Sequence, residues 1–328
     1  MDDNAAQNPV KAEGLWWADC GLVIQAENTV YRVSRDQLAS HSPVFHDMLL
    51  LPPPQNTETF EGCPLVRLQD KAEDMTTFLK ALFSYDYFPP HPLETTLSTI
   101  MRVLRISDKY GVDGLRARAL AHLDAAHPTT IAKWRKEQKS SLWAEIENDR
   151  LALETFILIR KLSLTWMLPF AFYRLCQAQC GIIVDLLSID SDKLSTADKK
   201  IILTGLRTLE GPETREVLEF LRTPILVDEC TDVFGCLAKR LAKRKEAEGW
   251  GDLDSCVGGE STGEPGLLPL DIWVAADWKN FAVCDGCLAY MKKTQKDALE
   301  KCWDRLPKIF DLPGWEDLEE ERRRVMQL

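Results

Sequence analysis

Strand signals in this chain are confined to about its first 70 residues, and helical periods fill the rest. Two short apolar runs, 22–24 and 29–33, are separated by Glu27-Asn28, which predicts a β-hairpin. A further run over 65–68 predicts one more strand. Because no later strands alternate with the helices, the sequence predicts an α+β fold and not a sheet built from βαβ units.

Helix signals follow these strands in the N-terminal part of the chain. Ser34 and the pair Ser42-Pro43 are expected to begin two short helices, since serine accepts hydrogen bonds from unpaired N–H groups and proline suits the first turn. Asp74 is expected to cap a third helix. Gly111 predicts the end of a longer one, because glycine readily adopts the left-handed conformation there.

The chain is expected to divide into four parts. Polar and small residues predict a disordered tail at the start, and six of the seventeen glycines cluster in a loop near the end. The expected parts are a disordered tail over 1–14, a first domain over 15–127, an α-helical region over 128–228, and a C-terminal module over 229–328 with a flexible loop at 249–266.

Charge and hydropathy exclude several kinds of partner. The formal net charge is −11, whereas binding to nucleic acid phosphates requires clustered Lys and Arg. Basic residues over 239–245 predict a solvated helix face, with a nuclear-localisation patch as the alternative. Four charged residues interrupt the most apolar long stretch, 151–176, so we expect no membrane span. A cytoplasmic or nuclear protein is therefore expected, whose ten cysteines do not form disulfides.

Short motifs follow the predicted elements in the order strand, strand, helix, helix, strand and three helices. They are Trp16-Trp17-Ala18-Asp19, Leu22-Val23-Ile24, Tyr31-Arg32-Val33, Leu38-Ala39-Ser40-His41-Ser42-Pro43-Val44-Phe45, Met48-Leu49, Pro64-Leu65-Val66-Arg67-Leu68, Phe78-Leu79-Lys80-Ala81-Leu82-Phe83-Ser84-Tyr85 and Leu104-Arg105-Ile106-Ser107-Asp108-Lys109-Tyr110-Gly111, with Leu115 and Ala119. Together they resemble the BTB/POZ family over about a third of the chain. One departure is Ser34, because the family usually has histidine at the start of the first helix.

This resemblance implies a protein-interaction domain that forms a homodimer. Some members of the family also recruit a cullin-type ubiquitin ligase scaffold with the help of helices that follow the domain, which residues 128–180 would supply here. We therefore expect a non-enzymatic interaction scaffold or adaptor. The alternatives are a BTB-containing transcriptional regulator and a monomeric, zinc-stapled binding protein.

The whole chain is also similar to a group of fungal BTB proteins of basidiomycete type. In that group a helical region follows the BTB domain, so the similarity implies an architecture and no activity. The tail residues that carry it are Pro269-Leu270-Asp271-Ile272-Trp273, Cys284-Asp285-Gly286-Cys287 and Leu306-Pro307-Lys308-Ile309-Phe310-Asp311-Leu312-Pro313-Gly314-Trp315.

The chemically most specific pattern is Cys284-x-x-Cys287. Two thiolates at this spacing suit one tetrahedral zinc ion, which needs a second pair of ligands. Cys230 and Cys236, about fifty residues upstream, are the nearest candidates, so these four cysteines are expected to hold a structural zinc ion. The alternatives are ordinary buried thiols and a redox pair, which would lack its usual βαβ surroundings.

A serine-hydrolase pattern occurs once and does not predict catalysis. Residues 259–263 read Gly-Glu-Ser-Thr-Gly, but the G-x-S-x-G turn requires a preceding strand and a following helix, and glycines and Pro265 flank this match. All five histidines lie between His41 and His127, upstream of the serine, so the hydrolase order of serine, acid and histidine is not met. We expect no catalytic residues and no required cofactor other than structural zinc.

Overall fold

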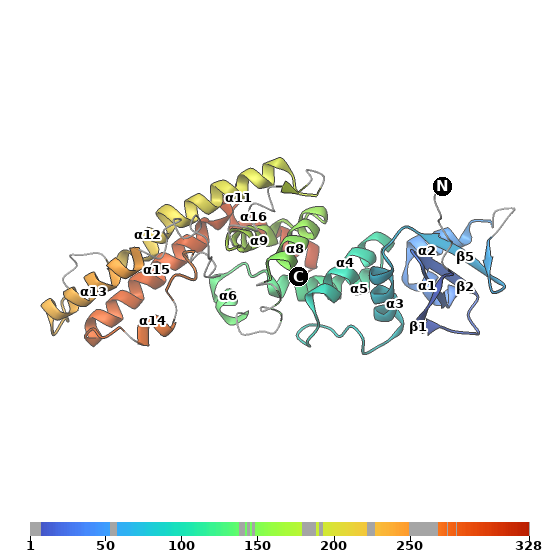
Figure 1. The fold of residues 1–328 in the computed structure, drawn as a ribbon, viewed down its shortest axis with the longest axis horizontal. Helices are drawn as coiled ribbons and strands as arrows, with labels where there is room; N and C mark the ends of the chain where they lie inside the picture. The colour runs from blue at the N-terminus through green and yellow to red at the C-terminus, as the bar shows by residue number, and fades with distance from the viewer. Residues whose placement is uncertain are drawn as a thin grey trace. The chain divides into compact units, whose positions relative to one another are not determined.

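The computed structural model describes residues 8–52, 58–137, 142, 145, 148–178, 188–189, 193–221, 227–248, 268–273, 275–279 and 281–327. Its contacts divide the chain into an N-terminal unit, 1–126 with 140–146, and a C-terminal unit, 127–139 with 147–328 (Figure 1). The strands lie in the N-terminal unit, and the described part of the C-terminal unit is helical. The predicted α+β class is confirmed at this level.

A five-stranded mixed sheet in the order β1-β3-β2-β5-β4 lies in the N-terminal unit. The predicted hairpin is confirmed, because β2 (Leu22–Ala26) pairs antiparallel with β3 (Thr29–Val33). The third predicted strand is β5 (Cys63–Leu68), which runs parallel to β2 and antiparallel to the short β4 (Thr59–Phe60). A parallel neighbour requires a long connection, and the two helices after the hairpin supply it.

The first strand corrects the expected disordered tail over 1–14. Residues from Val10 onward form β1 (Val10–Trp16), which pairs in parallel with β3, so the prediction of disorder was wrong there. Its two buried residues, Ala12 and Leu15, are three positions apart, because the register shifts within the strand, where Gly14 has a φ of 74°. This irregularity hides the alternation by which a strand is recognised in sequence.

The helices of the N-terminal unit begin and end largely where the sequence predicts. The hydroxyls of Ser34 and Ser42 each accept a backbone N–H from three residues further on, at 3.3 and 3.1 Å. Gly111 ends the fourth helix with a φ of 64°. The helices are α1 (Arg35–His41), α2 (Pro43–Leu50), α3 (Ala72–Phe83), α4 (Leu97–Tyr110) and α5 (Asp113–Ala126).

Asp74 does not cap α3, contrary to the sequence prediction. The helix begins at Ala72, two residues before Asp74, and Lys71 occupies the capping position. Asp74 instead lies buried in the first turn, where its carboxylate accepts a hydrogen bond from Arg105 at 2.6 Å. A carboxylate in the first turn is also favoured by the helix dipole, so the acidic residue serves α3 without capping it.

Aromatic side chains join the sheet and helices of the N-terminal unit. Tyr31 of β3 is fully buried, and its hydroxyl donates to the backbone oxygen of Ala72 at 2.8 Å. The ring of Phe45 stacks on Tyr110, with centroids 4.3 Å apart, and the hydroxyl of Tyr110 donates to Asp70 at 2.6 Å. Tyr31 and Tyr110 thus each combine a largely buried ring with a fixed polar contact, and Phe45 joins α2 to α4 through its ring.

The apolar periods of the sequence predict helices over 151–167, 170–179, 195–209 and 214–222, and the C-terminal unit has a helix at each of these places. The first ends early, at Lys161, because Ser163 takes a left-handed conformation with φ of 55°. The last is α-helical only to Val217 and is followed by a short 3-10 helix. The elements are α6 (Ile131–Glu137), α8 (Asp149–Lys161), η1 (Thr165–Met167), α9 (Leu168–Cys176), α11 (Thr196–Thr208), η2 (Leu209–Glu213), α12 (Thr214–Val217), η3 (Glu219–Leu221), α13 (Val233–Glu248), α14 (Ala275–Lys279), α15 (Asp285–Ile309) and α16 (Trp315–Met326).

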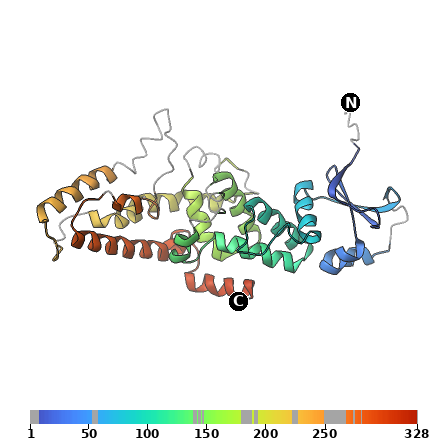
Figure 2. The same cartoon turned by 90° about the horizontal axis from the view of Figure 1, so that it is seen from below.

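The long helix α15 lies alongside α11 and α12 (Figures 1 and 2). Its Trp303 packs near Phe170 of α9, with ring centroids 6.3 Å apart, and Phe310 just beyond α15 stacks on Phe172 at 5.1 Å. The helical region and the C-terminal module, expected as separate parts over 128–228 and 229–328, therefore share one core. The sequence predicts a helix over 289–306 with six residues on one inward stripe. This stripe is confirmed, because all six residues are buried: Met291, Gln295, Ala298, Leu299, Cys302 and Leu306.

None of the helices in the described ranges has the length and apolar character needed to cross a bilayer. The loop predicted over 249–266, with the serine-hydrolase match inside it, lies outside the described residues.

Candidate metal centre

The four cysteines predicted as metal ligands lie together in the C-terminal unit. The Sγ atoms of Cys230, Cys236, Cys284 and Cys287 are all within 4.8 Å of one another, and those of Cys230 and Cys284 are 3.8 Å apart. A tetrahedral zinc ion with bonds of about 2.3 Å to sulfur separates its ligands by about 3.8 Å. All four are free thiols, so the cluster has the composition and the size of a four-cysteine zinc site.

Two helix N-termini bring these cysteines together. Cys236 lies at the end of the first turn of α13. Asp232 precedes this helix, and its carboxylate accepts a hydrogen bond from the N–H of Gly235 at 2.9 Å. Cys284 is the residue before α15, and Cys287 is in its first turn. The N-terminus of a helix carries partial positive charge, which favours the thiolate form that metals bind.

Backbone N–H groups point at the sulfur atoms of the cluster. The N–H of Cys284 donates to the Sγ of Cys236 at 3.3 Å. Hydrogen bonds from the backbone of Cys287 and of Thr231 lower the pKa of the Cys284 thiol to about 6. Burial raises the pKa of Cys236 and of Cys287. Cys284 therefore loses its proton more readily than Cys236 or Cys287, and a bound divalent cation would offset the burial of those two sulfur atoms.

Gly286 lets the loop that carries Cys230 approach α15. A Cβ atom at this position would lie 2.6 Å from the backbone oxygen of Glu229, closer than such atoms pack. The nearest atoms belong to backbone, which cannot rotate away. The glycine inside the Cys284-Asp285-Gly286-Cys287 run is thus a steric requirement of the cluster, which sequence reasoning did not identify.

The surroundings of the cluster fit a structural site. Cys236 and Cys287 are buried, and Cys230 and Cys284 are half-buried. Four protein ligands complete a tetrahedron and leave no position for a substrate or a reactive water, as in structural zinc sites. The geometry can cross-link two chain segments and offers no metal-bound nucleophile.

The basic cluster on α13 differs from the predicted solvated face. Lys239 is exposed as expected, whereas Arg240 is buried and donates from Nη2 to the backbone oxygen of Phe220 at 2.9 Å. Arg240 therefore attaches α13 to η3 within the C-terminal unit. A hydrogen bond from a buried guanidinium to a carbonyl is a positioning contact, and it leaves fewer charges for the alternative of a nuclear-localisation patch.

Comparison with known proteins identifies no relative of this chain. No family model matches it, and neither a curated protein nor a solved structure does. The assignment of the centre depends on the four sulfur atoms, their spacing and the backbone around them.

Proposed function

We propose that the chain is a non-enzymatic protein-interaction protein whose N-terminal unit is a BTB/POZ-type domain. The order of elements in that unit is the observation that supports this best. An antiparallel hairpin, β2 and β3, is followed by two short helices, a strand parallel to β2 and three further helices. This is the order that the sequence resemblance implies for the family. The fold positions α1 and α2 beside the hairpin, and an interaction role follows from the domain type.

The proposed partner of the N-terminal unit is a second copy of the chain. Large apolar side chains stay exposed on and just after α2: Val44 is 44 % exposed, and Leu50 and Leu51 are both 69 % exposed. The three side chains lie within eight residues of one another, on α2 and at the residue that follows it. Burying such a patch against its own copy is the usual basis of a symmetric dimer.

Light scattering tests the proposed dimer. The purified chain is expected to have the mass of a dimer at micromolar concentration, and the double variant Val44→Asp/Leu50→Asp is expected to be a monomer. Leu93→Asp, which changes an equally exposed leucine in the loop before α4, serves as the control and should stay dimeric. A native chain with the mass of a monomer would contradict the proposal.

We also propose that Cys230, Cys236, Cys284 and Cys287 hold a structural zinc ion. Elemental analysis of the purified chain should find about one zinc ion per chain. Cys287→Ser should abolish most of this zinc, whereas Cys20→Ser in the N-terminal unit should retain it. Zinc below about half an equivalent in a preparation never exposed to chelators would contradict the site.

Two kinds of further partner suit a BTB-type protein, and both are proposals here. One is a cullin-type ubiquitin ligase scaffold, for which the chain would be an adaptor; the other is a set of chromatin proteins, for which it would be a transcriptional regulator. Affinity purification from the native cell separates them, because recovery of a cullin favours the adaptor and recovery of chromatin proteins favours the regulator.

A further inference from the structure

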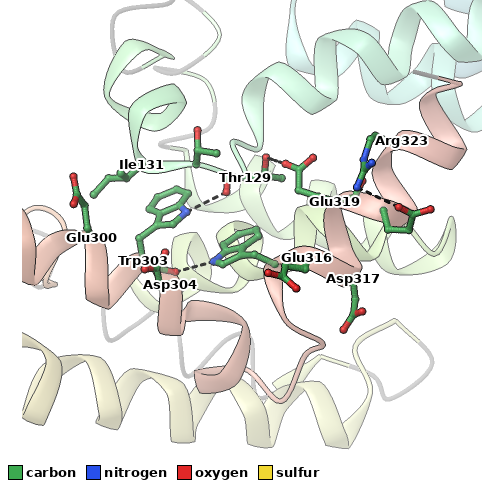
Figure 3. Close-up of a pocket in the computed structure, with 12 residues that line it drawn as sticks. Thr129, Ile131, Glu300, Trp303, Asp304, Glu316, Asp317, Glu319 and Arg323 are labelled. Atoms are coloured by element: carbon green, nitrogen blue, oxygen red, sulfur yellow. Dashed lines mark hydrogen bonds and ion pairs between the residues drawn. The ribbon is translucent and has the colours of Figure 1, made fainter.

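A solvent-open groove lies within the C-terminal unit, beside the second half of α15, whereas Cys287 of the cysteine cluster lies in the first turn of that helix. It has a volume of about 760 Å³ and is formed by α15, α16 and the residues at the start of α6 (Figure 3). This size is within the about 300–1,000 Å³ of typical ligand sites. The lining residues are Thr129, Thr130, Ile131, Glu300, Trp303, Asp304, Trp315, Glu316, Asp317, Glu319, Glu320 and Arg323.

Two tryptophans form the aromatic part of this groove. The rings of Trp303 and Trp315 are nearly parallel, with an angle of 8° between them and centroids 6.0 Å apart. The indole N–H of Trp303 donates to the backbone oxygen of Thr129 at 3.2 Å, and that of Trp315 donates to the backbone oxygen of Trp303 at 3.0 Å (Figure 3). Both donors are satisfied, so the rings are held in place. Trp303 is buried, and the half-buried Trp315 is the ring that can present a π surface to a ligand.

Carboxylates dominate the rest of the lining. Six of the twelve lining residues are acidic, and Arg323 is the one cation among the twelve. Some of this charge is already neutralised, since Glu319 lies 3.3 Å from Arg322 and Glu320 lies 3.1 Å from Arg323. Among the described residues, no side-chain hydrogen bond or ion pair involves the carboxylates of Asp304, Glu316 or Asp317.

The unpaired carboxylates are not explained by helix stability alone. Glu316 and Asp317 lie in the first turn of α16, where the helix dipole favours negative charge. Asp304 comes from α15, more than a turn from either of its ends, where the dipole gives no such support. Asp304 and Glu316 both line the groove (Figure 3), so two helices contribute negative charge to it.

We propose that this groove binds a basic segment of a partner protein, with an arginine or lysine side chain against Trp315 and beside Asp304 and Glu316. An aromatic face attracts a cation through its quadrupole, and the nearby carboxylates add charge attraction. From Glu316 to Glu320 the acidic rim follows α16 for about 6 Å, the length of about two residues of extended chain. The inference rests on the proposed role in protein interactions and names the chemistry of one partner.

Fluorescence anisotropy of a labelled peptide tests the groove. The probe is a fluorescein-labelled peptide of alternating glycine and arginine, and a glycine–glutamine peptide of the same length is its control. The native full-length chain should bind the arginine peptide saturably and the glutamine peptide much more weakly. The Asp304→Asn/Glu316→Gln variant should bind the arginine peptide about fivefold more weakly, as expected for two exposed charge pairs.

A matched variant separates the groove from the general negative charge of the chain. Glu13→Gln/Asp86→Asn removes the same two charges from exposed positions of the N-terminal unit and should bind the arginine peptide as the native chain does. Equal weakening in both double variants, or no saturable binding to the native chain, would overturn the inference. Light scattering on the same samples shows independently whether the proposed dimer exists, so failure of one proposal is distinguishable from failure of the other.

Discussion

Single residues determine the two most specific features of this molecule, the four-cysteine cluster and the acidic groove. The cysteine spacing was visible in the sequence because ligand type and separation are local properties of the chain. The role of Gly286 was not visible in the sequence, because it depends on the close approach of Glu229, which is far away along the chain. The unpaired Asp304 and Glu316 are similarly invisible, because an acidic residue on a helix surface is usually just solvated.

Replacing Gly286 tests whether close approach of the two segments is needed for metal binding. Gly286→Ala should displace the loop that carries Cys230, because the added methyl would overlap the backbone of Glu229. The variant should release zinc to a competing chelator at a lower chelator concentration than the native chain does. Gly211→Ala, where the added methyl meets no atom within 4 Å, is the control. Equal zinc retention in both variants would contradict the steric argument.

His122 makes the stability of the N-terminal unit depend on pH. Its ring nitrogen contacts the backbone oxygen of Pro89 at 2.9 Å, and burial is the main cause that lowers its pKa below 6.5. The folded state therefore favours the neutral ring, and the unfolded state binds a proton more readily. The contribution of His122 to the free energy of unfolding is complete above pH 6.5. It is lost as the pH falls from that value through the lower pKa of the folded state.

Denaturant unfolding at a series of pH values measures this effect. From about pH 7 to about pH 5 the free energy of unfolding should fall more steeply in the native chain than in His122→Gln, whose amide does not titrate. An identical slope in the His122 variant would show that this residue is not the group that titrates.

At the scale of elements, the sequence predicts best what depends on neighbouring residues. The β2–β3 hairpin, the serine caps of α1 and α2 and the buried stripe of α15 are local patterns, and all are confirmed. Strand β1 was missed because its pairing with β3 is irregular. The joining of the helical region to the C-terminal module was missed because contacts such as Phe172 with Phe310 link distant parts of the chain.

The guanidinium of Arg305 links α15 to η2 and to α12. Arg305 donates to the carboxylates of Glu213 and Glu216 at 2.6 and 2.7 Å, and Glu213 is buried. Arg305→Met should lower the free energy of unfolding by about 1–3 kcal/mol, because it leaves the Glu213 carboxylate buried without its partner. Lys301→Met, an exposed position on the same helix, is the control for loss of charge and should change stability by less than about 0.5 kcal/mol.

Adding a second change to this variant distinguishes ion pairing from packing. Arg305→Met/Glu213→Gln should recover part of the lost stability, because a neutral amide is less costly to bury than an unpaired carboxylate. No recovery would mean that the aliphatic part of Arg305 stabilises the contact and that its charge does not.

At the scale of the whole molecule, each unit has its own core, and the proposed zinc site belongs to only one of them. The four cysteines connect α13 to the start of α15 within the C-terminal unit. Aromatic and aliphatic residues such as Tyr31 and Phe45 fill the core of the N-terminal unit without any of these cysteines. A zinc ion at the proposed site would therefore couple metal binding to folding in the C-terminal unit only.

Removal of zinc should consequently act on one unfolding transition and leave the other unchanged. A ligand that binds only the folded state stabilises it by about 4 kcal/mol when its free concentration is 1,000 times its Kd, and a chelator removes this contribution. In calorimetry of the full chain, the transition of the C-terminal unit should move to lower temperature on chelation and return when zinc is added back. Cys287→Ser should show the lowered transition without chelator, and Cys63→Ser, in the N-terminal unit, should leave the zinc response intact. If chelation instead lowers both transitions equally, the two units unfold as one cooperative structure and the metal stabilises the whole chain.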